Sequence, residues 1–399
     1  MIVSVNNLSI KYLSAIYFIV FIALIDHSTI APVIAQYGRS LGASSSLAGL
    51  ITASYSIAAL FALPIIGILL DKFSRTRILQ ILLAIDPLIT LMYTRASDPY
   101  QLLIIRSLHG AIDSGVFPSI LAIFRDIVTR RLGLGLTIYW ILSALPIIIG
   151  NFITRQLVIL YGFHSIFYLV AILFLIGFSL SLYIGKGYRE LVFREEIPEY
   201  TIDKKNKISS TLIIAYASAL TLYLMIGSVV GSMGTLLTEK LYVTREIASA
   251  EVATWSMISS VISLLFIAVF TSYLVKNPRN LLVTKLIGLL MILCSSTLLI
   301  LGIDHLTRLT SSVLFGGALG TILPASSKAA TDVRFRRRGL SSALLSVSFL
   351  IGVIIGSVSS SRILEYSHRE YLNLNFMPPF IASMILVVYV IIVLIFWRR

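Results

Sequence analysis

The chain has 399 residues, of which 57% are apolar and only 13% are charged. Soluble proteins usually carry about a quarter charged residues, so this composition excludes an ordinary soluble domain and indicates a polytopic membrane protein. The net charge of +14 does not indicate a nucleic-acid-binding protein, because the Lys and Arg residues lie at the ends of apolar runs rather than on one soluble surface. The single cysteine, Cys294, lies within an apolar run, which excludes a disulfide framework and a thiolate metal cluster.

Twelve apolar runs along the chain are long enough to span a bilayer as helices. Three contain internal charges: the first, about 12–34, contains Asp26; the third, about 77–94, contains Asp86; the fourth, about 100–124, contains Arg106 and Asp113. Nine lack internal charges, namely 40–70, 132–154, 165–185, 208–238, 252–275, 286–303, 309–327, 339–361 and 371–397. The predicted fold is therefore all-α, with twelve transmembrane helices.

The distribution of basic residues predicts the topology. If the N-terminus lies inside, most of the 32 Lys and Arg residues fall in inner segments, Lys285 among them. This bias predicts that both termini are cytosolic and that the protein is a multi-pass protein of the plasma membrane. With Lys285 in a loop, every charge within a helix lies in the N-terminal half of the chain.

An internal repeat divides the chain into two halves. When 110–134 is aligned with 316–340, identical residues coincide at Pro118 and Pro324, Asp126 and Asp332, Arg130 and Arg336, Arg131 and Arg337, and Gly133 and Gly339. Repeated halves with a substrate site between them are typical of secondary transporters. We expect an N-terminal six-helix bundle over 1–185, a polar cytosolic linker over 186–210 and a C-terminal six-helix bundle over 211–399, the two bundles being related by pseudo-symmetry.

The loop from Gly67 to Arg77, GILLDKFSRTR, has the spacing G-x-x-x-D-K-x-S-R-x-R. It resembles the loop between the second and third helices of the major facilitator superfamily. A second stretch, Arg106-Ser-Leu-His109-Gly110, is similar to the superfamily's R-x-x-[QH]-G pattern. The first helix, around Asp26 and Pro32, resembles the drug/proton antiporter branch, while the fifth-helix antiporter pattern is half present, with Leu145 and Ile149 in place of glycines.

This resemblance implies a cytosolic gate formed by Gly67, Asp71, Arg75 and Asp126. Gly67 would allow close helix approach, and Asp71 would face the N-terminal end of the eleventh helix, near 339–342, where the helix dipole favours a carboxylate. Arg75 would pair with Asp126 at the inner end of the fourth helix. Because Val275 stands where the second half would repeat the acid, the latch is expected to be one-sided.

The candidate residues for proton coupling are Asp26, Arg106, His109 and Asp113. Arg106, His109, Gly110 and Asp113 are spaced i, i+3, i+4 and i+7, so they share one face of the fourth helix. Asp26 lies about eight residues before the outer end of its predicted helix, at a depth similar to Arg106, so these two side chains are expected to pair. Proton exchange at Asp113 or Asp26, with Arg106 tuning it, is one hypothesis; an ion pair that only holds the helices together is the alternative. Asp86, directly before Pro87, is expected to accompany a kink in a peripheral helix.

In the C-terminal half, the candidate cavity residues are Tyr216, Tyr223, Phe315 and Thr321. The alternative for this region is close helix packing by small residues. Charge confined to one half, opposite an aromatic wall, favours a neutral or amphipathic cargo over a strongly anionic one.

We therefore expect a secondary transporter with alternating access, coupled to protons and directed to efflux of small organic compounds. A proton symporter or uniporter for uptake is the alternative within transport, and a lipid flippase or sensor is another. An intramembrane enzyme is not expected, because no H-E-x-x-H or paired-acid metal pattern occurs. The expected partners are the substrate, protons and the lipid bilayer; no cofactor, metal or nucleic acid is expected, and the protein is expected to be a monomer.

Overall fold

The computed structural model describes residues 2–127, 132–192, 210–274, 278–331, 338–367 and 371–396. Over these ranges the chain is almost entirely helical and forms no strand. Ten helices within them are long and apolar enough to cross a membrane, and α6 and the α4–α5 pair complete the twelve spans. The all-α prediction is confirmed.

The N-terminal half contributes seven helices and one 3₁₀ turn: α1 (Ile2–Ser40), α2 (Ser45–Lys72), α3 (Arg75–Met92), η1 (Tyr93–Arg95), α4 (Pro99–Asp113), α5 (Val116–Ile127), α6 (Leu132–Tyr161) and α7 (His164–Val192). Local signals set the starts of α2 and α4. Ser44 Oγ accepts the backbone N–H of Leu47 at 3.2 Å, and Asp98 Oδ1 accepts those of Tyr100 and Gln101 at 2.9 and 3.0 Å.

The fourth predicted helix is divided into α4 and α5, with a turn at Ser114 and Gly115. Pro118 explains the break, because it has no N–H to donate to the carbonyl of Ser114 four residues earlier. Gly115 lies at this turn in close contact with α2, since a Cβ would lie 2.6 Å from Ile66 Cδ1. The prediction of one continuous helix over 100–124 is therefore wrong at this point.

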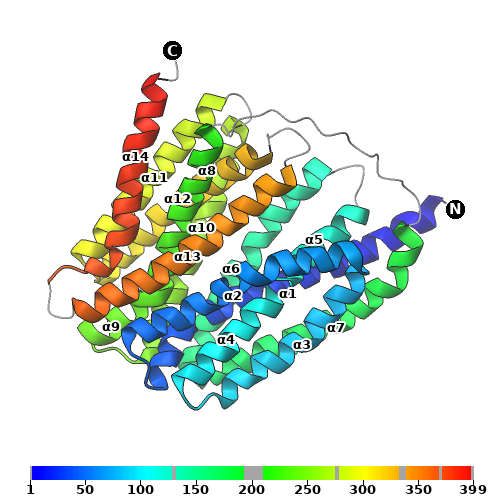
Figure 1. Cartoon of the computed structure of the whole chain (residues 1–399), viewed down its shortest axis with the longest axis horizontal. Helices are drawn as coiled ribbons and strands as arrows, with labels where there is room; N and C mark the ends of the chain where they lie inside the picture. The colour runs from blue at the N-terminus through cyan, green and yellow to red at the C-terminus, as the bar shows by residue number, and fades with distance from the viewer. Residues whose placement is uncertain are drawn as a thin grey trace.

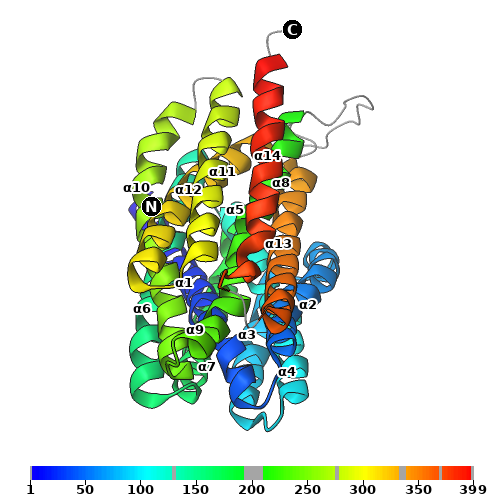
Figure 2. The same cartoon turned by 90° about the vertical axis from the view of Figure 1, so that its left-hand side faces the viewer.

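The C-terminal half contributes α8 (Ser210–Ser228), a π-helical turn η2 (Val229–Met233), α9 (Gly234–Lys240), α10 (Arg245–Leu274), α11 (Pro278–Leu301), α12 (His305–Thr331), α13 (Arg338–Tyr366), the 3₁₀ turn η4 (Leu374–Phe376) and α14 (Met377–Phe396). Each half has its own apolar core. One core draws on residues between Ala15 and Ile184 with Ala250, and the other on residues between Ile214 and Val390. Figures 1 and 2 show the blue-to-green helices α1–α7 beside the green-to-red helices α8–α14.

The two bundles are held together at the end of the molecule that carries the α1–α2 turn, here called the α1–α2 end. Arg39 Nη2 lies 3.2 Å from Glu239 Oε1, and Gln36 Nε2 donates to Thr235 Oγ1 at 3.0 Å. The backbone N–H of Ser46 donates to Glu365 Oε2 at 2.7 Å. A row of polar contacts therefore joins α1 and α2 to α9 and α13 at this end.

The opposite end, which carries the α2–α3 turn, is open around the residues of the predicted gate. A Cβ added to Gly67 would meet no atom within 4 Å, and Asp71 is exposed. In contrast, a Cβ on Gly49, near the α1–α2 end of α2, would overlap Ser361 of α13. The structure thus corresponds to a state closed at the α1–α2 end.

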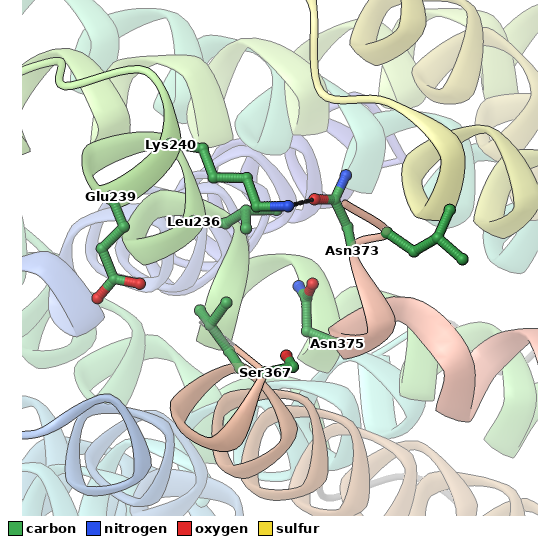
Figure 3. A pocket seen from close by; sticks show the side chains of 8 residues that line it. Leu236, Glu239, Lys240, Ser367, Asn373 and Asn375 are labelled. Carbon is green, nitrogen blue, oxygen red and sulfur yellow. Dashed lines mark hydrogen bonds between the residues drawn. The ribbon is translucent and has the colours of Figure 1, made fainter. Parts of the chain in front are cut away.

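A small polar pocket of about 90 Å³ also lies at the α1–α2 end, beside the Arg39–Glu239 pair. Figure 3 shows Lys240 of α9 reaching across it to Asn373, with 2.8 Å between Nζ and Oδ1. It is lined by Leu236, Glu239, Lys240, Leu364, Ser367, Leu372, Asn373 and Asn375, none of which is a predicted site residue.

We expect Gly110→Ala to lower the stability of the N-terminal bundle. A Cβ at this position would overlap the backbone carbonyl of Tyr55, and backbone cannot move aside as a flexible side chain can. Overpacking of this kind costs about 1–3 kcal/mol. Thermal unfolding of the detergent-solubilised protein measures the effect, and Gly67→Ala is the matched control because its Cβ would enter open space. Equal midpoints for the two variants would contradict the prediction.

Candidate functional site

One face of α4 carries the predicted constellation into the interior of the N-terminal bundle. Arg106, His109, Gly110 and Asp113 are all buried, with exposed fractions of 2% for Arg106, 0% for His109 and 6% for Asp113. The i, i+3, i+4, i+7 spacing therefore does place them on a single buried face, which packs against α1, α2 and η1.

His109 lies at the centre of this cluster. Its Nε2 is 3.6 Å from Oδ2 of Asp26, and its Nδ1 is 3.1 Å from the Tyr93 hydroxyl and 3.4 Å from Nη1 of Arg106. Because a guanidinium can only donate, Nδ1 is assigned as the acceptor, and the neutral ring then carries its proton on Nε2, facing Asp26. His109 thus connects the Asp26 carboxylate with the Arg106 guanidinium.

Arg106 does not pair directly with Asp26 as expected. Its Cζ lies 4.6 Å from the centroid of the Tyr55 ring, in cation–π geometry, and its Nη1 lies 3.4 Å from the Tyr93 hydroxyl. The expected depth of Asp26 also needs correction, since α1 continues to Ser40 and Asp26 lies about 20 Å from that end. The contact between the two charges runs through His109.

Asp113 is held by a tyrosine that the sequence did not reveal. The Tyr55 hydroxyl, on α2, donates to Oδ2 of Asp113, while Oδ1 has no hydrogen-bond partner. Tyr55 therefore contacts both the cation and the carboxylate of the cluster. Sequence reasoning missed Tyr55 and Tyr93 because tyrosines are common in membrane helices, and no local pattern marks those that point inward.

Ligand atoms of Asp26, His109 and Asp113 lie within 4.8 Å of one another, a spacing that a divalent cation would accept. Two features disfavour a metal here. The Arg106 guanidinium already supplies a positive charge beside His109, and the tautomer above leaves no lone pair on Nε2. The cluster is better suited to holding and moving protons.

Asp86 is placed differently from the prediction. Its side chain in α3 is 0% exposed, and neither carboxyl oxygen has a hydrogen-bond partner. Because the side chain is fully buried, it faces the protein interior rather than the surface of the bundle. Its position before Pro87 indicated a kink and gave no sign of this orientation.

Lys285 corrects the expectation that the C-terminal half has no internal charge. The structure begins α11 at Pro278, which places Lys285 in the second turn, 0% exposed, with Nζ 3.3 Å from the carbonyl oxygen of Thr211. The hydropathy pattern had predicted that this helix begins after Lys285. Pro278 was the available signal, because proline favours the first position of a helix.

The predicted gate residues lie at the α2–α3 end. Asp71 is exposed in the last turn of α2, and Arg75 is half-buried at the start of α3. Asp126 belongs to α5, but its side chain lies outside the described residues. The Arg75–Asp126 pair and the contact of Asp71 with the start of α13 therefore stay predictions.

The four candidate cavity residues of the C-terminal half separate into two pairs. Tyr216 and Tyr223 are half-buried: the Tyr216 hydroxyl lies 2.7 Å from Ser341 Oγ, and Tyr223 stacks on Phe349 at 4.3 Å between centroids. Phe315 and Thr321 are 2% and 0% exposed and make packing contacts, Phe315 with Trp255 at 4.8 Å and Thr321 with the Gly317 carbonyl at 2.9 Å. The packing alternative thus fits Phe315 and Thr321.

Comparison with known proteins now adds to this geometry. The family model described as Major Facilitator Superfamily matches residues 16–334. The chain belongs to the major facilitator superfamily. Solved structures of this superfamily have the same fold: the nucleoside transporter NupG superposes with a TM-score of 0.73 at 15% identity, over 96% of this chain and 98% of that one. A bacterial homolog of the human lysosomal transporter Spinster, described as inward-facing and occupied, superposes with a TM-score of 0.73 at 16% identity, over 95% of each chain.

Sequence relatives of this superfamily member include both uncharacterized and named transporters. An uncharacterized MFS-type transporter of Methanocaldococcus jannaschii is 24% identical over 353 residues, 88% of this chain and 90% of its own. A multi-drug resistance efflux pump of Streptococcus pneumoniae is 25% identical over 171 residues, 40% of this chain and 42% of the pump. The multidrug resistance protein MdtG of Salmonella schwarzengrund is 32% identical over 96 residues, 23% of this chain and 24% of its own.

Membership of the major facilitator superfamily fixes the broad class. The chain is a multi-pass membrane transporter built as two pseudo-symmetric six-helix bundles, and its family and fold point to transport rather than to enzymatic catalysis. The buried charges of α1, α3 and α4 therefore lie within a transport fold, where such charges commonly act on substrate or coupling ions.

Proposed function

We propose that the protein exports a small neutral or amphipathic organic compound in exchange for protons. The observation that carries this proposal is the buried cluster of Asp26, Tyr55, Arg106, His109 and Asp113 in the N-terminal bundle. Burying ionisable groups in a membrane protein is costly, and such groups usually mark an ion or proton pathway. Proton exchange would explain why ionisable groups are buried at this place, whereas helix packing alone would not.

Asp113 is the proposed site of proton exchange. Of the three acids in the interior it is the most exposed, at 6%, compared with 1% for Asp26 and 0% for Asp86. Its Oδ1 is free to take a proton while the Tyr55 hydroxyl holds Oδ2. Arg106, over the ring of the same tyrosine, stabilises the ionised form through its charge.

We propose export because 40% of the chain is similar to one multidrug efflux pump and 23% to a multidrug resistance protein. A neutral or amphipathic cargo is proposed from the half-buried Tyr216 and Tyr223 opposite the charged bundle. Lys285 adds one cation to that half, but it lies near the start of α11 and contacts a backbone carbonyl.

Uptake by proton symport or uniport is the second candidate. The fold it shares with a nucleoside transporter is compatible with uptake of a small organic solute. Reconstituted vesicles distinguish the two: export by antiport predicts that an outward substrate movement drives protons inward, whereas symport moves both in the same direction. Substrate movement that does not depend on the pH gradient would overturn both antiport and symport with protons.

The cellular arrangement is also part of the proposal. The protein is proposed to be a plasma-membrane monomer with both termini cytosolic, and the basic residues at the α2–α3 end support this orientation. The proposed division is a bundle over 1–185, a linker over 186–210 and a bundle over 211–399, and the separate cores of the two halves support it. Protease accessibility of the termini and of 186–210 in inside-out vesicles tests both proposals.

We expect Asp71→Asn to leave folding intact and to slow transport by about tenfold or more. Asp71 is exposed in this state, so its loss breaks no contact here, but the proposed gate needs its charge against the start of α13 when the α2–α3 end closes. Initial transport rates in vesicles measure the effect. Lys72→Gln, next to it and also exposed, is the control and is expected to transport normally. Normal turnover by Asp71→Asn would refute the latch.

A further inference from the structure

The end of α13 contacts the start of α2 at the closed α1–α2 end of the molecule. The backbone N–H of Ser46, in the first turn of α2, donates to Oε2 of Glu365 at 2.7 Å. Glu365 lies in the last turn of α13, which ends at Tyr366. A carboxylate of the C-terminal bundle therefore accepts a hydrogen bond from a helix start of the N-terminal bundle.

Glu365 shares the capping of α2 with a residue of the N-terminal bundle. The first N–H groups of a helix have no partner within that helix, and the helix dipole favours a carboxylate beside them. Ser44 accepts the N–H of Leu47 at 3.2 Å, whereas the N–H of Ser46 is bound by Glu365. Separation of the bundles at this end would break the contact with Glu365 and leave the Ser44 cap intact. The Glu365 contact thus stabilises the closed arrangement rather than α2 by itself.

The packing around this contact brings α2 and α13 close together. Ser361 and Glu365 are four residues apart, so their side chains lie on one face of α13. A Cβ on Gly49, in the second turn of α2, would overlap Ser361. Ser361 also donates to the carbonyl oxygen of Gly231 in η2 at 2.9 Å. The face of α13 that carries Glu365 is therefore the face that packs against α2, and Figure 1 shows the two helices beside each other at this end.

The α1–α2 turn is anchored to the C-terminal bundle at the same place. Nη1 of Arg39 donates to the carbonyl oxygen of Ala43 at 2.8 Å, and Nη2 lies 3.2 Å from Oε1 of Glu239 in α9. This arrangement ties the turn that leads into α2 to the C-terminal bundle. It keeps the N–H of Ser46 within reach of Glu365.

The opposite end of the same two helices carries the reverse arrangement. There α2 ends at Lys72 and α13 begins at Arg338, so the acid, Asp71, belongs to α2 and the helix start belongs to α13. Asp71 is exposed, and a Cβ on Gly67 would meet no atom within 4 Å. Each end of the α2–α13 pair thus offers one carboxylate and one helix start. In this state the contact is formed at the α1–α2 end, while Asp71 is exposed at the other.

We propose that Glu365 is the latch of the state closed at the α1–α2 end, and that it is the counterpart of Asp71 in the opposite state. Closing one end of the α2–α13 pair separates the carboxylate and the helix start at the other end, so the two contacts form in turn. Loss of the Glu365 charge shifts the protein toward the state that is open at the α1–α2 end, and loss of the Asp71 charge shifts it the other way. The role of Asp71 rests on the cytosolic gate proposed above, whereas the Glu365 contact is present in the structure.

Distances between two spin labels measure this equilibrium in the purified full-length protein, without substrate and without a gradient. The labels are attached through Tyr100→Cys at the start of α4 and Leu306→Cys at the start of α12, in a Cys294→Ser background; both positions are exposed and lie in different bundles at the α1–α2 end. We expect Glu365→Gln and Glu365→Ala to raise the ratio of long to short distances about tenfold, because a hydrogen bond to a charged group is lost. Glu246→Gln, which changes an acid in the first turn of α10 at the same end, is the control and is expected to leave the ratio unchanged.

A ratio that stays at the wild-type value in both Glu365 variants would overturn the proposal. Unfolding midpoints are measured on the same samples, because a purely structural role would lower the midpoint and leave the ratio unchanged. Adding Asp71→Asn to Glu365→Gln is expected to return molecules to the short distance. If Glu365→Gln opens the α1–α2 end and the added Asp71→Asn has no effect, the latch at Glu365 stands and the proposed gate at Asp71 fails.

Discussion

Asp113→Asn is expected to abolish the dependence of transport on a pH gradient, while exchange of labelled for unlabelled substrate across the membrane continues. The amide has nearly the shape of the acid and can still accept the hydrogen bond from Tyr55, but it cannot take up or release a proton. Loss of uphill transport is expected to be at least about a hundredfold, because coupling rather than binding is removed.

The measurement pairs two assays on the same vesicles: accumulation driven by an imposed pH gradient, and counterflow without a gradient. Asp26→Asn is the matched variant, since it changes the other acid of the cluster. If Asp26→Asn loses gradient-driven transport and Asp113→Asn keeps it, the proton is carried by Asp26. Gradient-driven transport in both single variants would leave the cluster without a role in coupling.

Arg106→Gln is expected to be the most destabilising single change in the cluster and to eliminate transport. It removes the guanidinium from the cluster that contains the buried acids Asp26 and Asp113, together with the cation–π contact with the Tyr55 ring. Leaving buried carboxyls without their counter-charge costs about 3 kcal/mol, and the variant is expected to regain stability at low pH, where these acids are neutral.

The sign of this pH effect distinguishes an electrostatic role from simple packing. Unfolding midpoints of Arg106→Gln and the wild type should converge as the pH falls from 8 to 5. Arg106→Lys keeps the charge and is expected to recover most of the stability, though not the planar stacking on Tyr55. A stability loss that stays constant with pH would show that Arg106 acts through packing alone.

Several parts of the site followed from local pattern. Arg106, His109, Gly110 and Asp113 share a buried face because helical spacing fixes which residues of one helix lie together. The interaction partners of these residues on other helices could not be predicted from this pattern. Tyr55 is 58 residues from Asp113, and which tyrosine of α2 points inward depends on how α2 rotates against α4, where Gly110 lets the backbones approach.

The two misplaced charges show a related limit. The prediction considered each apolar run separately, and it therefore assigned Lys285 to a loop and Asp86 to a kink in a peripheral helix. The structure buries both, because the start of α11 at Pro278 and the packing of α3 on α4 and α7 decide their surroundings. Whether a charge is buried is a property of neighbouring helices, which a single run of sequence does not contain.

Composition and spacing along one chain were enough to establish the membrane class, the twelve spans, the repeat and the Gly67–Arg77 motif. The prediction that this motif is a loop is wrong, because α2 continues to Lys72 and α3 begins at Arg75. The three-dimensional packing was needed to show that Asp26 meets Arg106 through His109, and that Asp86 lies inside the bundle. It also decided which end is closed: Arg39 meets Glu239 while Asp71 stays exposed. These outcomes depend on how two bundles and their helices pack in space, and that packing is set by contacts between residues far apart in the chain.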